Sequence, residues 1–144
     1  IPALQHDRVI ALKASRPDLT IELNGGLDTP EDCLNALKHL DGAMVGRAAY
    51  AHPLRWRNID SLIFGAAPRQ VLASGVVLGL IPHADRHLQR GGRLWDLCRH
   101  LVHIVEAVPG ARHWRNNLST KAQKAGAGIE IIEVAAQQLL DAGL

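Results

Sequence analysis

Two short apolar segments, each followed at once by a glycine turn, constrain the fold of this chain most strongly. The first, 19–23 (LTIEL), alternates apolar and polar residues and precedes the turn 24–26 (NGG). The second, 43–45 (AMV), is wholly apolar and precedes Gly46-Arg47. Alternation with period two predicts a β-strand, and a wholly apolar strand is typical of a parallel sheet buried on both faces. The segments therefore indicate parallel β-α units.

Helical patterns surround these strands and then replace them. Residues 7–15 and 29–40 are expected to be helical, the latter capped by Thr29 with Pro30 at its first position, and a short helix follows Gly46. After Gly65 the strand signals fade. Four further helices are predicted over 68–89, 94–108, 110–124 and 128–140. The fold class is therefore α/β plus all-α, with a boundary that separates residues 1–65 from 66–144.

The paired turns have a plain and a more specific interpretation. The plain one is ordinary turn formation, for which glycine is well suited. The specific one is that both backbones approach a single phosphate, as the loops after the last two strands of a TIM (β/α)₈ barrel commonly do. A small part of an open sheet is the alternative architecture. The candidate phosphate-site residues are Gly25, Gly26, Gly46 and Arg47, and Asn24 at the strand end could bond a ring edge or a ribityl hydroxyl of the same ligand.

Composition excludes several classes of protein. The chain of 144 residues is 47% hydrophobic and 21% charged, so disorder is not expected. Its longest apolar run, 76–81, is far short of a membrane span, and no signal peptide is predicted. The two cysteines have no CxxC partner, so neither a disulfide framework nor a zinc site is expected, and a reducing cytoplasm is the default. Because the chain begins Ile-Pro, we expect a piece of a longer protein.

Positive charge is concentrated in the second half of the chain. Residues 1–65 contain seven basic and eight acidic residues, whereas 66–144 contain nine basic and six acidic ones. Eight basic residues fall between 86 and 124: Arg86, Arg90, Arg93, Arg99, Arg112, Arg115, Lys121 and Lys124. Such asymmetry predicts a polyanionic partner, with a solvated basic helix face as the alternative.

We do not expect a catalytic, metal-binding or base-stacking role for the cysteines, two of the histidines and one tryptophan. Cys33 and Cys98 fit buried small hydrophobic positions better than catalytic ones. His100 and His103 lie three apart on a predicted helix, but without a third ligand nearby they predict no metal site. Trp114 could stack on a base, but with Leu118 one turn later it is expected in the core.

Three motifs are similar to those of a known family. They are IELNGG, HLDGAMVGRAAY and VPGARHWRNNLSTKAQKAGAG, and together they resemble the C-terminal part of the tRNA-dihydrouridine synthases, subfamily A. The similarity extends from the DRVIALK segment to the last predicted helix. The chain departs from the family at Gln5-His6, where the family usually has a pair ending in tyrosine.

The resemblance implies a fold and an activity. It implies the last β-α units of an FMN-binding TIM barrel over 1–65, followed by a four-helix bundle that binds tRNA over 66–144. Asn24, Gly25, Gly26, Gly46 and Arg47 would contact FMN. The implied reaction is reduction of tRNA D-loop uridines 20 and 20a, with NADPH as reductant.

The resemblance also implies which residues contact tRNA and where the catalytic cysteine lies. Arg112 and Arg115 would contact tRNA. The family's catalytic cysteine belongs to a part of the barrel that this chain lacks, so no catalytic residue is expected here and the piece alone should be inactive. A monomeric cytoplasmic enzyme is implied. A non-catalytic RNA-binding helical module without cofactor, and a barrel enzyme acting on a phosphorylated metabolite, remain as alternatives.

Overall fold

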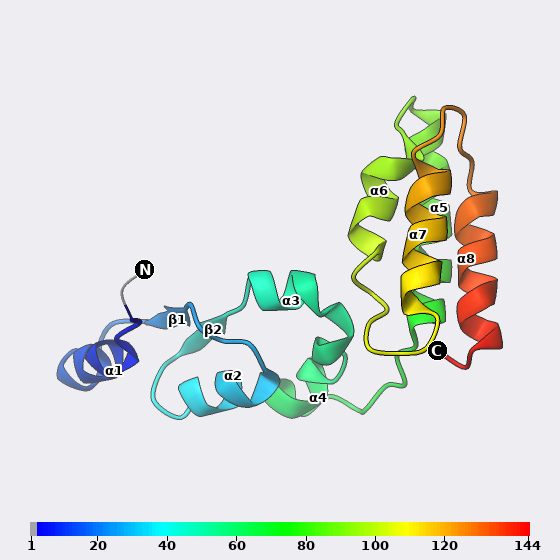
Figure 1. The fold of residues 1–144 in the computed structure, drawn as a ribbon. Coiled ribbons are helices and arrows are strands. Elements are labelled where there is room, and N and C mark those ends of the chain that lie inside the picture. The colour runs from blue at the N-terminus through cyan, green and yellow to red at the C-terminus, as the bar shows by residue number, and fades with distance from the viewer. Residues whose placement is uncertain (1–2) are drawn as a thin grey trace. The chain divides into compact units, whose positions relative to one another are not determined.

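The protein divides into two compact units in a computed structural model that describes residues 3–144 (Figure 1). The first unit is Ile1–Arg69 and the second is Gln70–Leu144. The division falls between Arg69 and Gln70, a few residues after the change in composition near Gly65.

The first unit contains the predicted parallel pair of strands. Its elements are α1 (His6–Ser15), β1 (Glu22–Asn24), α2 (Pro30–Ala36), β2 (Gly42–Met44), α3 (Arg47–Ala51), the 3₁₀ helix η1 (Pro53–Trp56) and α4 (Ile59–Phe64). β1 and β2 pair in parallel, with Leu23 opposite Ala43. The predicted order of helix, strand, helix, strand, helix is therefore confirmed, and η1 and α4 were not predicted.

Two boundaries in this unit differ from the prediction. β1 begins at Glu22 rather than Leu19, because the backbone N–H of Ile21 donates to the carboxylate of Asp41 at 2.8 Å rather than to a neighbouring strand. α2 ends at Ala36 rather than Leu40, although the N–H of Leu40 still bonds the Ala36 carbonyl at 3.0 Å. The predicted N-terminus of α2 is confirmed, since Thr29 and Asp32 form a reciprocal capping box.

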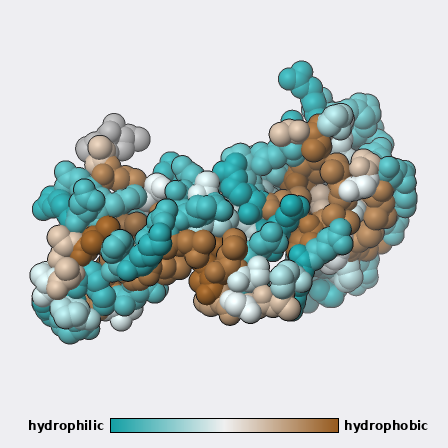
Figure 2. Space-filling model, turned by 90° about the horizontal axis from the view of Figure 1, so that it is seen from below, coloured by the Kyte–Doolittle hydropathy of each residue, from teal (hydrophilic) through white to brown (hydrophobic). Residues whose placement is uncertain are grey.

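The core of the first unit is small. Its buried residues are Leu23, Leu27, Cys33, Ala36 and Leu40. Large apolar side chains remain on the surface, and Phe64 is 78% exposed. On the face seen in Figure 2, hydrophobic surface extends along this unit. A core of this size leaves much of the unit's apolar surface in contact with solvent.

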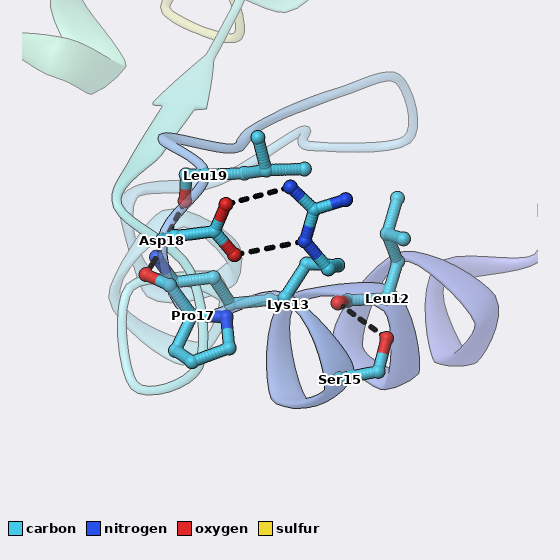
Figure 3. Close-up of polar contacts among 7 residues, drawn as sticks. Leu12, Lys13, Ser15, Pro17, Asp18 and Leu19 are labelled. Atoms are coloured by element: carbon cyan, nitrogen blue, oxygen red, sulfur yellow. Dashed lines mark hydrogen bonds and ion pairs between the residues drawn. The ribbon is translucent and has the colours of Figure 1, made fainter.

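Lys13 connects α1 by hydrogen bonds to the segment that leads into β1. Its ammonium donates to the carbonyls of Pro17 at 3.1 Å and Leu19 at 2.7 Å (Figure 3). It also pairs with the Asp41 carboxylate at 2.8 Å. Since Asp41 holds the N–H of Ile21, one cluster of charges fixes the entrances of both strands.

The second unit consists of four helices, α5 (Ala73–Gln89), α6 (Leu94–Leu101), α7 (Ala111–Ala122) and α8 (Glu130–Asp141). α5 packs against α6 and α8, and α7 packs against the same two helices. Leu94, Leu118, Ile132 and Val77 are almost completely buried among them. No helix within residues 3–144 has the length and apolarity that a membrane span requires.

The prediction of one helix over 94–108 is wrong. α6 ends at Leu101, and Ala107 has a φ of +56°, a left-handed conformation that a right-handed helix cannot contain. Pro109 reinforces the break because it disfavours helical geometry in the residue before it. Ile104 and Val105 nevertheless stay buried, so their apolar pattern marks a core loop rather than a helix. α5 likewise begins at Ala73 rather than Pro68.

Candidate functional site

The two glycine turns lie side by side at the C-terminal ends of the paired strands. They line one pocket of about 200 Å³, together with the start of α3. All five of the residues predicted from the sequence line it: Asn24, Gly25, Gly26, Gly46 and Arg47. The strand register explains this arrangement, because Asn24 is opposite Met44 and the two following turns leave the sheet at the same edge.

Gly25 and Gly26 have backbone conformations that favour glycine. Their φ values are +112° and +68°, in the region that L side chains rarely adopt. A Cβ on Gly26 would also lie 2.8 Å from a methyl carbon of Leu4. The imidazole Nε2 of His6 lies 3.0 Å from the Gly25 carbonyl oxygen, so α1 supports the turn from outside the pocket.

Gly46 and Arg47 complete the pocket from the second turn. A Cβ on Gly46 would meet no atom within 4 Å, so the space beside it is open. Arg47 is exposed and, within residues 3–144, its guanidinium makes no hydrogen bond or ion pair. The pocket therefore contains a guanidinium that has no hydrogen-bond partner among the described residues, and a backbone that a ligand atom can approach closely.

A second, larger pocket of about 560 Å³ adjoins the first. Arg47, Gly26 and Asp28 line both of them, and His52 and Arg55 extend the second. The Arg55 guanidinium donates to the Asp28 carbonyl at 3.0 Å, which ties η1 to the loop after β1. A ligand larger than a phosphate group thus has room beside Arg47.

Neither cysteine is suited to nucleophilic or acid catalysis. Cys33 and Cys98 are buried, as the sequence predicted. Burial raises the pKa of Cys33, with the nearby Asp32 carboxylate adding to the effect, and burial raises the pKa of Cys98 to about 11. Both thiols are therefore protonated near neutral pH, and neither lines the pocket of the two turns. The lining of this pocket thus includes the guanidinium of Arg47 and no cysteine thiol.

The arginines predicted to contact RNA, Arg112 and Arg115, have different environments. Arg112 is exposed on α7 and makes no hydrogen bond within the described residues. Arg115 is half-buried, and its guanidinium donates to the Val105 carbonyl at 2.8 Å. That bond holds the loop between α6 and α7. Arg115 therefore has a structural contact that the sequence did not reveal.

The sequence predicts that Trp114 lies in the core of the second unit and that His100 and His103 form no metal site. Trp114 is 4% exposed, and its indole N–H donates to the Ala135 carbonyl at 2.9 Å, so its placement in the core is confirmed. Among residues 3–144, His100 and His103 belong to no group of three or more side chains arranged to bind a metal. Seven of the eight basic residues between 86 and 124 are exposed. The eighth, Arg115, is half-buried and bonds the loop between α6 and α7.

Comparison with known proteins places this chain in one family. A model of the dihydrouridine synthases (Dus) matches residues 1–141, and the chain therefore belongs to the dihydrouridine synthase family. The curated relatives that it resembles are named tRNA-dihydrouridine(20/20a) synthase.

Three relatives illustrate the extent of the similarity. The protein of Shewanella oneidensis is 41% identical over 139 residues, which cover 96% of this chain and 42% of that protein. The protein of Escherichia coli K12 is 39% identical over 141 residues, covering 98% and 41%. The protein of Vibrio cholerae is 38% identical over 135 residues, covering 94% and 41%. The chain thus spans about 42% of the length of the curated relatives it matches.

Proposed function

We propose that this chain is the C-terminal part of a flavin-dependent tRNA-dihydrouridine synthase. Residues 1–65 would supply the last β-α units of an FMN-binding TIM barrel, and residues 66–144 a four-helix bundle that binds tRNA. The complete enzyme would reduce D-loop uridines 20 and 20a with NADPH as the source of electrons. The observation that carries the proposal is the single pocket lined by all five predicted cofactor residues.

The residues of this pocket fit the phosphate of FMN. The planar guanidinium of Arg47 has no hydrogen-bond partner among the described residues, so it can donate two N–H bonds to two oxygens of a phosphate. Gly46 leaves open space where a side chain would obstruct a ligand. Asn24, exposed at the end of β1, offers an amide that can both donate and accept hydrogen bonds. These residues would bind and orient the cofactor, and FMN when bound would supply hydride transfer to the uracil ring.

Protonation of the base requires an acid, and the family resemblance assigns that role to a cysteine. Cys33 and Cys98 are buried with raised pKa values. We therefore assign the proton donor to the part of the protein that lies outside these 144 residues. The isolated chain is expected to form no dihydrouridine.

Charge supports the second unit as the tRNA-binding part. Its exposed basic side chains can neutralise backbone phosphates, which is the main source of non-specific affinity for nucleic acid. Arg112, exposed on α7 without a protein partner among the described residues, is the best placed of the predicted contacts. A small phosphorylated metabolite would have no use for this basic helical unit.

The experiment uses the full-length protein that carries this chain. Purified apoprotein is titrated with FMN while the flavin spectrum is followed, and the loaded protein is then given NADPH and unmodified tRNA. We expect saturable flavin binding and dihydrouridine at the D-loop. A protein that binds tRNA but leaves the flavin spectrum unchanged would instead be the non-catalytic RNA-binding module.

A further inference from the structure

The peptide that joins Gly25 to Gly26 can in principle point either way. Glycine tolerates positive and negative φ about equally, so a Gly-Gly peptide has little intrinsic preference for one orientation. Its carbonyl and N–H project to opposite sides of the planar peptide. One orientation would present a carbonyl oxygen to a bound anion, and the other would present an N–H donor. Something outside the turn must choose between them.

His6 is in position to make that choice. Its Nε2 lies 3.0 Å from the Gly25 carbonyl oxygen, and it reaches the turn from α1, nineteen residues away in the sequence. The same ring packs against Gly26, where a Cβ would lie 3.4 Å from its Cε1 atom. His6 lines a different pocket from Asn24 and Arg47, and Gly26 lines both pockets.

The N–H of Gly26 is left for a ligand. Within residues 3–144 it donates no hydrogen bond. With the Gly25 carbonyl held toward His6, this N–H projects away from His6, and Gly25 and Gly26 both line the pocket with Arg47. A hydrogen bond to a charged oxygen contributes more than a bond between neutral groups.

From this geometry we propose that His6 is a positioning residue for the anion site. By donating its Nε2–H to the Gly25 carbonyl, it locks the Gly25–Gly26 peptide so that the Gly26 N–H faces a phosphate monoester. The inference rests on the proposed function, because the phosphate is that of FMN. His6 itself does not contact the phosphate.

The test compares two flavins that differ only in the phosphate. FMN and riboflavin are titrated into the full-length apoprotein that carries this chain, with flavin fluorescence as the readout. In His6→Phe we expect FMN affinity to fall by about tenfold, the size expected for one hydrogen bond to a charged group. Riboflavin affinity should not change. A simple loss of packing would weaken both flavins alike, and that result would overturn the inference.

Two variants isolate the hydrogen bond itself. His6→Gln places an N–H donor near the same position and should keep FMN affinity within about threefold of the wild type. His39→Phe is the matched control, because His39 lines the same pocket as His6 but makes no bond to the turn. If His6→Phe does not fold, His6→Ala removes the donor with a smaller side chain.

A further arm separates this inference from the function on which it rests. Arg47→Ala should also weaken FMN and spare riboflavin. If Arg47→Ala binds FMN like the wild type, the phosphate assignment itself is wrong. If Arg47→Ala loses affinity while His6→Phe and His6→Ala do not, the proposed role of His6 alone is wrong. The ³¹P resonance of bound FMN should shift in His6→Phe and return in His6→Gln.

Discussion

The two units of this chain bury their apolar residues to very different degrees. Among residues 3–144, the largest of the almost completely buried side chains are those of Leu94, Leu118, Ile132, Val77, Cys33, Cys98 and Ser74, and of these Cys33 alone lies in the first unit. Val77, Leu94, Leu118 and others fill the space between the four helices of the second unit. The first unit has two strands paired only with each other among the described residues, so each has an unpaired edge. The second unit therefore encloses a core between its four helices, whereas the first leaves large apolar side chains on its surface and strand edges unpaired among the described residues.

The largest expected effect is on independent folding. Residues 70–144 expressed alone should unfold cooperatively on heating, because their core is closed. Residues 1–69 alone should show no cooperative transition and should associate, since exposed strand edges and apolar surface favour self-pairing. Circular dichroism and sedimentation measure both properties. A monomeric, cooperatively folding 1–69 would show that the first unit also has a complete core of its own.

Core truncation in the second unit should be the next largest effect. Leu118 is 2% exposed, so Leu118→Ala should lower the free energy of unfolding of residues 70–144 by about 2–5 kcal/mol. Leu140→Ala is the control in the same unit, because that side chain is 45% exposed and should cost less than about 0.5 kcal/mol. Urea denaturation gives both values. Equal costs would contradict the assigned core.

The two arginines of α7 should separate RNA binding from stability. Arg112→Ala and Arg115→Ala together should weaken tRNA binding by the full-length protein at least about tenfold, on the order of 1.4 kcal/mol. Arg115→Ala alone should also lower the melting temperature, because it removes the bond to the Val105 carbonyl. Arg112→Ala should not. Binding is measured at several salt concentrations, and its salt dependence should become shallower because fewer phosphates are neutralised. Wild-type affinity in the double variant would remove α7 from the RNA interface.

The smallest effect concerns the pair of Lys13 and Asp41 that fixes the strand entrances. The hydrogen bond from Lys13 lowers the pKa of Asp41, with the N–H of Ile21 adding to it. A carboxylate with a lowered pKa stabilises the fold above its unfolded pKa, and that contribution is lost as the pH falls below about 4. Lys13→Met should therefore reduce the acid sensitivity of the full-length protein.

Lys38→Met is the matched control for this pair. Lys38 bonds the amide of Asn35 rather than a carboxylate. Its replacement should leave the acid-unfolding midpoint unchanged. Identical acid-unfolding curves for Lys13→Met and the wild type would show that the pair contributes nothing measurable.

Local patterns in the sequence predicted most helices and strands and identified five residues that line the pocket of the two glycine turns. The capping box at Thr29 and the order of helices and strands depend on neighbours within a few residues. The contacts that escaped prediction join distant positions. His6 bonds a carbonyl nineteen residues away, and Arg115 bonds one ten residues away. A bond between a side chain and a distant backbone carbonyl leaves no periodic signal, because any residue can supply the carbonyl.

The C-terminus of α6 lies at Leu101 rather than at the predicted Val108, because apolar spacing continues beyond the helix. Leu97, Leu101, Ile104 and Val108 keep helical spacing, yet the chain turns at Ala107. Burial rather than helix formation accounts for the apolar character of Ile104. Apolar spacing reports which residues are buried and does not by itself report the backbone conformation between them.

The most direct test of the central claim, that both glycine turns hold the phosphate of FMN, is the flavin affinity of Arg47→Ala in the full-length protein. We predict a loss of about 1.5–3 kcal/mol in FMN binding, because a charge-assisted bond to the phosphate is removed. Arg57→Ala, an exposed arginine of the same unit that does not line the pocket, should bind FMN like the wild type. If Arg47→Ala retains wild-type FMN affinity, the two turns do not form the phosphate site.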